Sequence, residues 1–169
     1  MQTMDNELLA TENKLWQILE NVKDPEIPVL SVVDMGIVTA VQLNTQNSAL
    51  ITITPTFVGC PALHTIQQNI MDEMKKGAID AEVKVDFETK WSSNRMTAGA
   101  REKLEKFGLA PPAEVNDEDL TEEQLNKVRC PHCHSTDTTL RSAFGSTLCR
   151  AIRFCFNCKQ GFEQFKPVA

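Results

Sequence analysis

The 169-residue sequence has no stretch that approaches the roughly 18 apolar residues needed to cross a membrane. Its start, MQTMDNELLATENK, lacks a basic segment followed by an apolar run, so we expect no secretory signal and a cytoplasmic location. Low-complexity tracts are also missing, and 41% of the residues are hydrophobic. The sequence therefore predicts a soluble folded chain, with one substantial core and a smaller appendage.

Charge is divided unevenly along the chain. Residues 128–169 contain six Lys and Arg and only two acids, a net charge of +4, which leaves −10 for residues 1–127. An acidic body with a small basic module is atypical of a general nucleic-acid-binding protein. We therefore expect no nucleic-acid partner, since only the basic tail favours one.

Hydrophobic periodicity predicts a small α+β domain at the start of the chain. The pattern indicates a helix over 6–22, antiparallel strands over 34–44 and 48–57, and a helix that begins near Pro61 and ends at Gly77. A third strand follows over 82–88, with Val83, Val85 and Phe87 facing inward. The fold class is α+β, in the order α-β-β-α-β, with the helices on one face of the sheet.

The rest of the chain predicts a second, smaller module. Residues 97–107 have helical propensity and are closed by Gly108, and we expect the first domain to end at residue 112. Residues 113–127 predict an acidic linker, because 113–124 hold six acids and almost nothing to bury. A four-cysteine β module over 128–169 completes the predicted organisation.

Two cysteine pairs predict a metal site in this module. CPHC and CFNC give the spacing C-x2-C-x21-C-x2-C, in which each pair can hold a metal within one tight turn. The predicted ligands are Cys130, Cys133, Cys155 and Cys158. Four thiolates suit structural zinc, which would supply most of the module's folding energy, although iron or a cluster also fits the pattern. His132 and His134 are alternative ligands beside the first pair.

Cys60 lies between Gly59 and Pro61, directly after a predicted strand. Pro61 at the first helical position would make Cys60 the N-cap, where the helix dipole and unpaired N–H groups lower a thiol pKa. A thiolate there would be a nucleophile or a soft-metal ligand, and the alternative is a small buried apolar residue. No second cysteine in C-x-x-C spacing and no Ser/His/Asp set accompanies it.

Asp24 and Glu26, in the segment DPE, follow the first predicted helix. In so small a domain this turn can approach Cys60, and carboxylates beside a thiolate suit iron better than a nucleophile, because negative charge raises the thiol pKa. The alternative is that Asp24 ends the helix and Glu26 is solvated. We expect Cys149, the one remaining cysteine, to pack under the metal site. The alternatives are that it is an extra ligand or an exposed thiol.

The segments DPEIPVLSVVDMGIV, ITITPTFVGCPAL and TKWSSNRMTAGAREKLEKFGLAPP, followed by the four-cysteine ribbon, resemble the PaaD (also PaaJ) family of the phenylacetyl-CoA oxygenase (epoxidase) system. The first part is similar to the metal–sulfur cluster assembly domain of SufT-like proteins. The resemblance implies an accessory protein of aerobic phenylacetate catabolism that helps assemble or maintain an iron or iron–sulfur centre in the oxygenase or reductase subunits. It marks Asp24, Glu26 and Cys60 as a transient site, the ribbon cysteines as zinc ligands, and Cys149 as the family's extra ribbon cysteine.

The chain has neither paired E-x-x-H helices nor a dinucleotide-binding glycine motif, so we expect an accessory protein rather than an enzyme. Three other interpretations stay open: an interaction subunit that docks through the ribbon, a thiol enzyme that uses Cys60, and a ribbon that binds nucleic acid. A single Cys60 thiolate cannot complete the coordination of a cluster. A homodimer in which two chains share one cluster is therefore a further interpretation.

Overall fold

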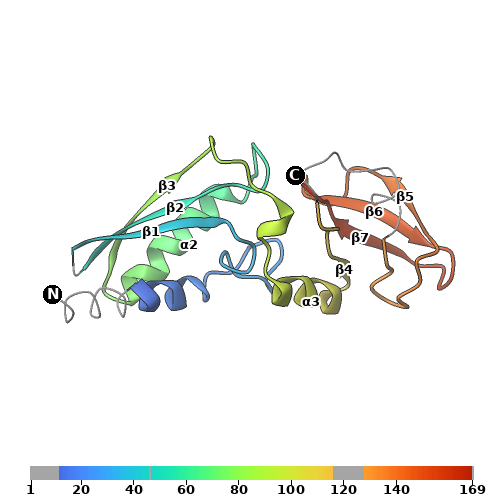
Figure 1. The fold of residues 1–169 in the computed structure, drawn as a ribbon, viewed down its shortest axis with the longest axis horizontal. Helices are drawn as coiled ribbons and strands as arrows, with labels where there is room; N and C mark the ends of the chain where they lie inside the picture. Colours follow the sequence, from blue (N-terminus) through green and yellow to red (C-terminus); the bar gives the residue numbers. More distant parts are fainter. Residues whose placement is uncertain (1–11, 46, 116–127, 169) are drawn as a thin grey trace. The chain divides into compact units, whose positions relative to one another are not determined.

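The computed structural model describes residues 12–45, 47–115 and 128–168, and the chain divides into two compact units, Met1–Thr89 and Lys90–Ala169 (Figure 1). Most of the predicted acidic linker lies outside the described residues. Among the described helices, none combines the length and the apolar character that a membrane span requires.

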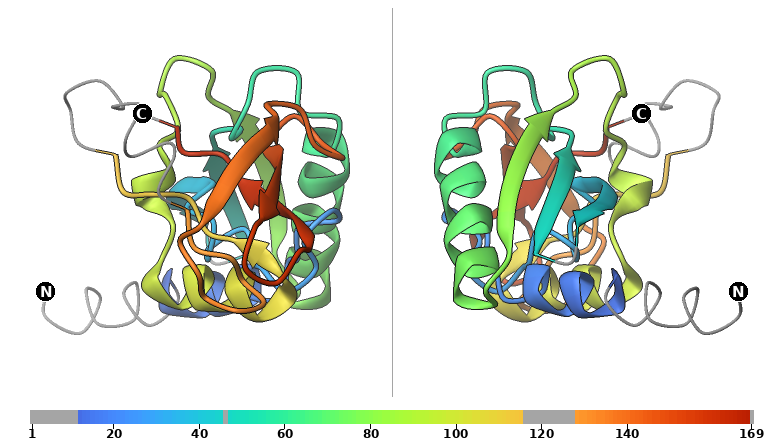
Figure 2. Two further views of the ribbon diagram at one scale, coloured as in Figure 1. Left: turned by 90° about the vertical axis from the view of Figure 1, so that its right-hand side faces the viewer. Right: turned by 90° about the vertical axis from the view of Figure 1, so that its left-hand side faces the viewer.

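A three-stranded sheet organises the N-terminal unit. Strands β1 (Val38–Thr45) and β2 (Ser48–Ile53) pair antiparallel, and β3 (Asp80–Val85) pairs parallel to β2. A parallel pair needs a crossover, which α2 (Leu63–Lys76) supplies between β2 and β3. Helix α2 lies alongside the sheet (Figure 2). The predicted α+β class and order are confirmed, and residues 12–19 form the described part of the first helix.

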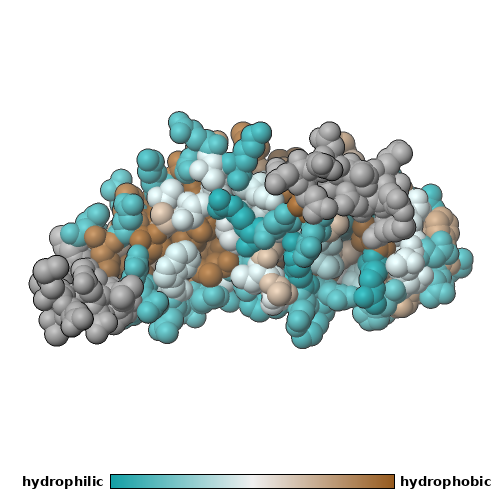
Figure 3. Space-filling model, viewed as in Figure 1, coloured by the Kyte–Doolittle hydropathy of each residue, from teal (hydrophilic) through white to brown (hydrophobic). Residues whose placement is uncertain are grey.

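The core of this unit follows from two periodicities. Alternate residues of β2 are buried, and α2 buries one residue in every four. The buried side chains are Ala49, Ile51 and Ile53 of β2 and Ile66, Ile70 and Met74 of α2. Burial of each large aliphatic side chain stabilises the fold by about 1.5–3 kcal/mol. On the face drawn in Figure 3, hydrophobic residues show between hydrophilic ones over β1 and β2.

The third strand is shorter than the sequence predicts. It ends at Val85, and Phe87, which we expected to face inward, is 61% exposed. The cause is Asp86, whose carboxylate accepts the N–H groups of Glu88 and Thr89 and turns the chain. The prediction for Phe87 is therefore wrong.

A four-stranded sheet organises the C-terminal unit. Its strands are β4 (Leu109–Ala110), β5 (Thr138–Ser142), β6 (Arg150–Cys155) and β7 (Gly161–Phe165), in the order β4-β7-β6-β5. Before them come a 3-10 turn, η1 (Ser93–Arg95), and helix α3 (Ala98–Phe107). The Thr97 hydroxyl caps α3, and Gly108 ends it in the left-handed region at φ +90°, as the sequence predicts.

Residues 90–112, which the sequence assigned to the first domain, pack with the ribbon instead. Strand β4 pairs parallel to β7, and the Trp91 ring lies 5.9 Å from that of Phe165. The Ser93 N–H donates to the Val168 carbonyl at 2.9 Å. Phe165 is fully buried, and Trp91 from this segment provides part of its cover.

Candidate metal centre

The four predicted ribbon cysteines come together at one point. Their sulfur atoms all lie within 4.8 Å of one another, with 3.7 Å between Cys130 and Cys158 and 3.6 Å between Cys133 and Cys155. A tetrahedral ion with metal–sulfur bonds of about 2.3 Å holds its ligands about 3.8 Å apart. The donor set therefore fits one tetrahedral metal ion that prefers thiolates.

Two similar turns present these sulfurs. The Cys130 carbonyl accepts the His134 N–H at 2.9 Å, and the Cys155 carbonyl accepts the Lys159 N–H at 3.0 Å. His134 and Lys159 both have left-handed backbone conformations, at φ +59° and +61°. Each C-x-x-C pair is thus folded into a compact knuckle, and the antiparallel strands between them bring the two knuckles together.

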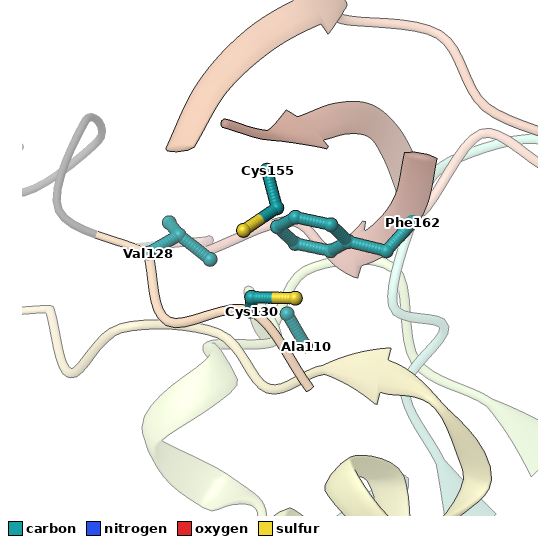
Figure 4. Packing of buried hydrophobic residues seen from close by; sticks show 5 residues of the cluster. All are labelled: Ala110, Val128, Cys130, Cys155 and Phe162. Atoms are coloured by element: carbon teal, nitrogen blue, oxygen red, sulfur yellow. The ribbon is translucent and has the colours of Figure 1, made fainter. Parts of the chain in front are cut away.

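An apolar layer closes the inner side of the site. Cys130 and Cys155 are fully buried and pack with Ala110, Val128 and Phe162 (Figure 4). Ala110 belongs to β4, so the segment before the ribbon contributes to the metal centre. Four sulfurs complete the coordination of a tetrahedral ion and leave no position for a substrate, which is typical of a structural site.

The pKa values of the two outer cysteine thiols are shifted in opposite directions. The Asn157 amide donates to the Cys133 sulfur at 3.5 Å, and with the Ser135 N–H it lowers the pKa of the Cys133 thiol to about 6. Burial, aided by the neighbouring cysteine side chains, raises the pKa of Cys158 to about 12. A bound metal ion would favour the thiolate at both positions, and its binding would release protons.

The other residues considered near the ribbon do not join the four-sulfur group. His134 Nδ1 lies 3.1 Å from the Glu105 carboxylate of α3. Cys149 is half-buried in the turn before β6, with its sulfur 3.0 Å from the Thr147 hydroxyl.

Cys60 does not cap a helix. Helix α2 begins at Leu63 with Ala62 as its N-cap, and the chain makes a turn before it, in which the Cys60 N–H donates to the Phe57 carbonyl at 3.2 Å. Gly59, at φ +84°, supplies the left-handed residue that this turn requires. A second turn follows, in which the Leu63 N–H donates to the Cys60 carbonyl at 3.2 Å. The prediction that Cys60 is the N-cap is wrong, because this second turn takes up Pro61 and Ala62, which the sequence assigned to the helix.

The prediction that the start of the helix lowers the pKa of Cys60 is also wrong, whereas the expected raising effect of the DPE carboxylates is found. Burial raises the pKa of this half-buried thiol, and the Asp24 and Glu26 carboxylates raise it further, against the lowering effect of the Ala62 and Leu63 N–H groups. The thiol is therefore mostly protonated near neutral pH. This disfavours a free nucleophile, although a metal ion can still displace the proton.

The two carboxylates of the DPE turn act on Cys60 through their charge, since both raise the pKa of its thiol. Asp24 is buried, and one of its carboxylate oxygens accepts the N–H groups of Glu26 and Ile27, both at 2.8 Å. Among the described residues, the ribbon cysteines are the only three or more potential ligands within 4.8 Å of one another. Cys60, Asp24 and Glu26 are thus neighbours that do not gather at ligand distance by themselves.

Sequence reasoning missed two parts of the metal centre. Asn157 had only its position inside CFNC to indicate a role as donor to a cysteine sulfur. The contribution of Ala110 had no signal, because a strand of two residues has no periodicity to recognise.

Comparison with known proteins gives one family match within each of the two compact units. Residues 12–87 match the family described as iron–sulfur cluster assembly protein, and residues 114–166 match the PaaD zinc beta ribbon domain. A protein of Escherichia coli strain K12, named as one of the subunits of 1,2-phenylacetyl-CoA epoxidase, is 37% identical over 92% of this chain and 93% of its own length. The chain belongs to the PaaD family.

Two shorter relatives match a little more than half of this PaaD chain over almost their whole length. An Fe-S protein maturation auxiliary factor of Porphyromonas gingivalis is 32% identical over 57% of the chain and 93% of its own length. The crystal structure of a DUF59 domain from Bacillus anthracis is 35% identical, with a TM-score of 0.53, and covers 56% of this chain and 92% of its own.

Proposed function

We propose that this protein is an accessory subunit of a phenylacetyl-CoA epoxidase system, and that it helps to assemble or maintain an iron or iron–sulfur centre in the oxygenase or reductase subunits. It carries out no reaction of its own. The observation that carries this proposal is the union, in one chain, of an assembly-type domain and a PaaD ribbon, with 37% identity to the named epoxidase subunit over almost the whole length.

Cys60, Asp24 and Glu26 form the transient site for the metal cargo in this proposal. One thiol and two nearby carboxylates offer iron both soft and hard ligands, and they are too few to hold it permanently. The proton on the free thiol also weakens metal binding, because the metal ion must displace it. The site suits an ion or a cluster that is received and passed on, with the remaining ligands supplied by a partner subunit or by a second copy of the chain.

The ribbon cysteines hold structural zinc in this proposal. Their spacing and closed, partly buried arrangement are typical of such sites. The raised pKa of Cys60 argues against the alternative of a thiol enzyme, because the protonated thiol is a poor nucleophile. An interaction subunit without metal transfer is the remaining alternative.

The test compares the wild type with Cys60→Ala, both purified without oxygen, by their zinc, iron and acid-labile sulfide content. Each variant is also produced together with the other epoxidase subunits, whose iron content is then measured. We expect both to keep one zinc, and Cys60→Ala to leave the partner subunits short of iron.

The matched control is Cys149→Ser, which removes the other cysteine outside the four-sulfur group. It should leave both the zinc and the iron of the partners unchanged. If Cys60→Ala supports full iron loading of every partner subunit, delivery through Cys60 is wrong and the interaction subunit becomes the better explanation.

A further inference from the structure

One face of the ribbon sheet exposes aromatic and aliphatic side chains beside a cation. Ile152 and Phe154 alternate along β6 and therefore lie on the same side of the sheet. Phe156 lies in the turn after β6, and its ring packs against that of Phe154. Ile152 is 40% exposed and Phe156 39% exposed, whereas Arg153 and Cys155, on the opposite side, are buried. We call Arg141, Ile152, Phe154 and Phe156 the β6 face.

Neighbouring strands leave this face uncovered. On β7 the residue paired with Phe154 is Gly161, which has no side chain to cover the ring. Among the described strands, β5 pairs with β6 alone, so it forms an edge of the sheet. The β6 face is therefore exposed because its neighbour on β7 is a glycine and its neighbour on the other side is an edge strand.

Arg141 is held over this face. The pairing of β5 with β6 shifts between Leu140 and Ser142, which makes Arg141 the extra residue of a bulge. Its guanidinium lies 5.2 Å from the centre of the Phe154 ring and 5.8 Å from that of Phe156, and the two rings pack edge to face at 5.4 Å. The cation is therefore preorganised, and Arg and aromatic residues are the types most enriched at the energetic centres of protein interfaces.

The charges around the β6 face favour an acidic occupant. Glu163, on β7, is paired with Arg150 at 2.9 Å, so its charge is locally neutralised. Arg150 is used in this pair, and Arg153 is buried. The remaining charged residues of the ribbon are four cations, Arg129, Arg141, Lys159 and Lys166, and one acid, Asp137. A second copy docked face to face would bring like charges together, whereas an acidic surface would be attracted.

We propose that the β6 face docks an acidic segment of a partner subunit, with Ile152 and Phe156 as apolar anchors and Arg141 as the pairing cation. The inference rests on the proposed function, because it names how the accessory subunit would hold its client while metal is transferred. It concerns the ribbon alone, so it is separable from the role of Cys60.

The test measures binding of the full-length, zinc-loaded chain to each purified oxygenase and reductase subunit of the same system, at low and at high salt. We expect one subunit to bind, more weakly at high salt, with a loss of more than tenfold for Arg141→Glu. Phe156→Ala and Ile152→Ser should each weaken binding about 5- to 30-fold, as expected for interface anchors. Ile152→Ser is the second apolar variant because Phe156 lies next to a zinc ligand.

Arg95→Glu and Phe107→Ala are the matched controls. Both residues are exposed in the same unit but belong to η1 and α3, and the substitutions make the same change of charge or loss of a ring outside the residues that define the β6 face. They should bind as the wild type does, and every variant should keep its zinc.

Three results would overturn the proposal: no subunit binds, the β6-face variants bind as tightly as the wild type, or the same variants abolish only self-association. Retention of a single-stranded thymidine oligonucleotide that depends on the β6 face, without binding of any subunit, would also overturn it, in favour of nucleic acid. Cys60→Ala should bind normally. Normal docking with no Cys60-dependent iron loading would retain the docking surface and remove the delivery function.

Discussion

The chain contains two cysteine sites that differ in almost every physical respect. In the ribbon, four sulfurs lie within 4.8 Å of one another, and two similar turns present them. In the N-terminal unit, Cys60 is the single cysteine, with carboxylates as its nearest electrostatic partners. The first site can saturate a metal ion with its own residues, and the second needs ligands from elsewhere.

The surroundings of the sulfurs also differ. Amide donors from Asn157 and Ser135 favour the thiolate of Cys133, whereas burial and neighbouring cysteines favour the protonated thiol of Cys158. At Cys60, burial and two carboxylates favour the protonated thiol, and no second cysteine of that unit offsets this effect. In the ribbon at least one ligand is therefore ready to bind. A site that exchanges its metal benefits from ligands that take the proton back on release. The comparison predicts that substitutions in the ribbon affect folding, and those near Cys60 affect reactivity.

The largest effect is expected from Cys155→Ser. In small zinc-binding peptides, structural zinc supplies about 10–16 kcal/mol of apparent binding free energy at pH 7, so loss of one buried ligand should abolish cooperative unfolding of residues 90–169. Zinc content and thermal unfolding followed by circular dichroism are the measurements. The transition of the N-terminal unit should remain.

Cys149→Ser is the matched control for this experiment, since it removes a ribbon cysteine that lies outside the four-sulfur group. It should retain one zinc and the second transition. If Cys155→Ser unfolds no more of the chain than Cys149→Ser does, the C-terminal unit does not depend on its metal.

A smaller but clear loss of stability is expected from Trp91→Ala. This side chain is 3% exposed and packs on Phe165, and loss of a buried Trp costs about 3–5 kcal/mol. Zinc should be lost to a chelator faster than from the wild type, because the segment that carries Trp91 also supports the metal centre through Ala110.

Phe107→Ala, at a side chain that is 46% exposed, should change stability by no more than a few tenths of a kcal/mol.

Fragments of the chain test the same support of the ribbon by the segment before it. A chain of residues 90–169 should fold around zinc more stably than one of 114–169. Equal stability of the two fragments would mean that the ribbon is independent of residues 90–112.

The sequence predicted the elements with strong periodicity and the metal ligands with fixed spacing. Strands β1 and β2, helix α2 and the four ribbon cysteines follow from patterns that short-range physics imposes. The position of β4 did not, because two residues gain their structure from β7 and not from their own preference. The attachment of Trp91 to the ribbon is likewise a tertiary contact that no local pattern contains.

The error at Cys60 has a similar cause. Pro61 suits the first turn of a helix, but it equally suits a turn that precedes one, here the turn in which the Leu63 N–H donates to the Cys60 carbonyl. The helix begins two residues later than the sequence predicted, and this shift makes Ala62 the capping residue in place of Cys60. The effect of the DPE carboxylates on the thiol was expected because a small domain has few places for this turn to go, but burial, which no local pattern contains, contributes most to the raised thiol pKa.

The smallest expected effect sharpens the comparison at Cys60 itself. Because the pKa of this thiol is raised above its ordinary value, its thiolate fraction at neutral pH is low, and alkylation by iodoacetamide should be slower than for a free cysteine. Asp24→Asn and Glu26→Gln each remove a negative charge, so each should lower the pKa and raise the alkylation rate a few-fold near pH 7.5. The rate should rise with pH in all three proteins, and the pH midpoint should fall in the variants.

The turn that carries these carboxylates should survive both changes. Asp24→Asn keeps a side-chain oxygen that can accept the Glu26 and Ile27 N–H groups, so a faster reaction would report charge and not unfolding. A midpoint that does not move when both charges are removed would show that burial alone sets the pKa of Cys60. The carboxylates would then not act on the sulfur that they are proposed to assist, and the contrast with the ribbon would rest on the number of sulfurs alone.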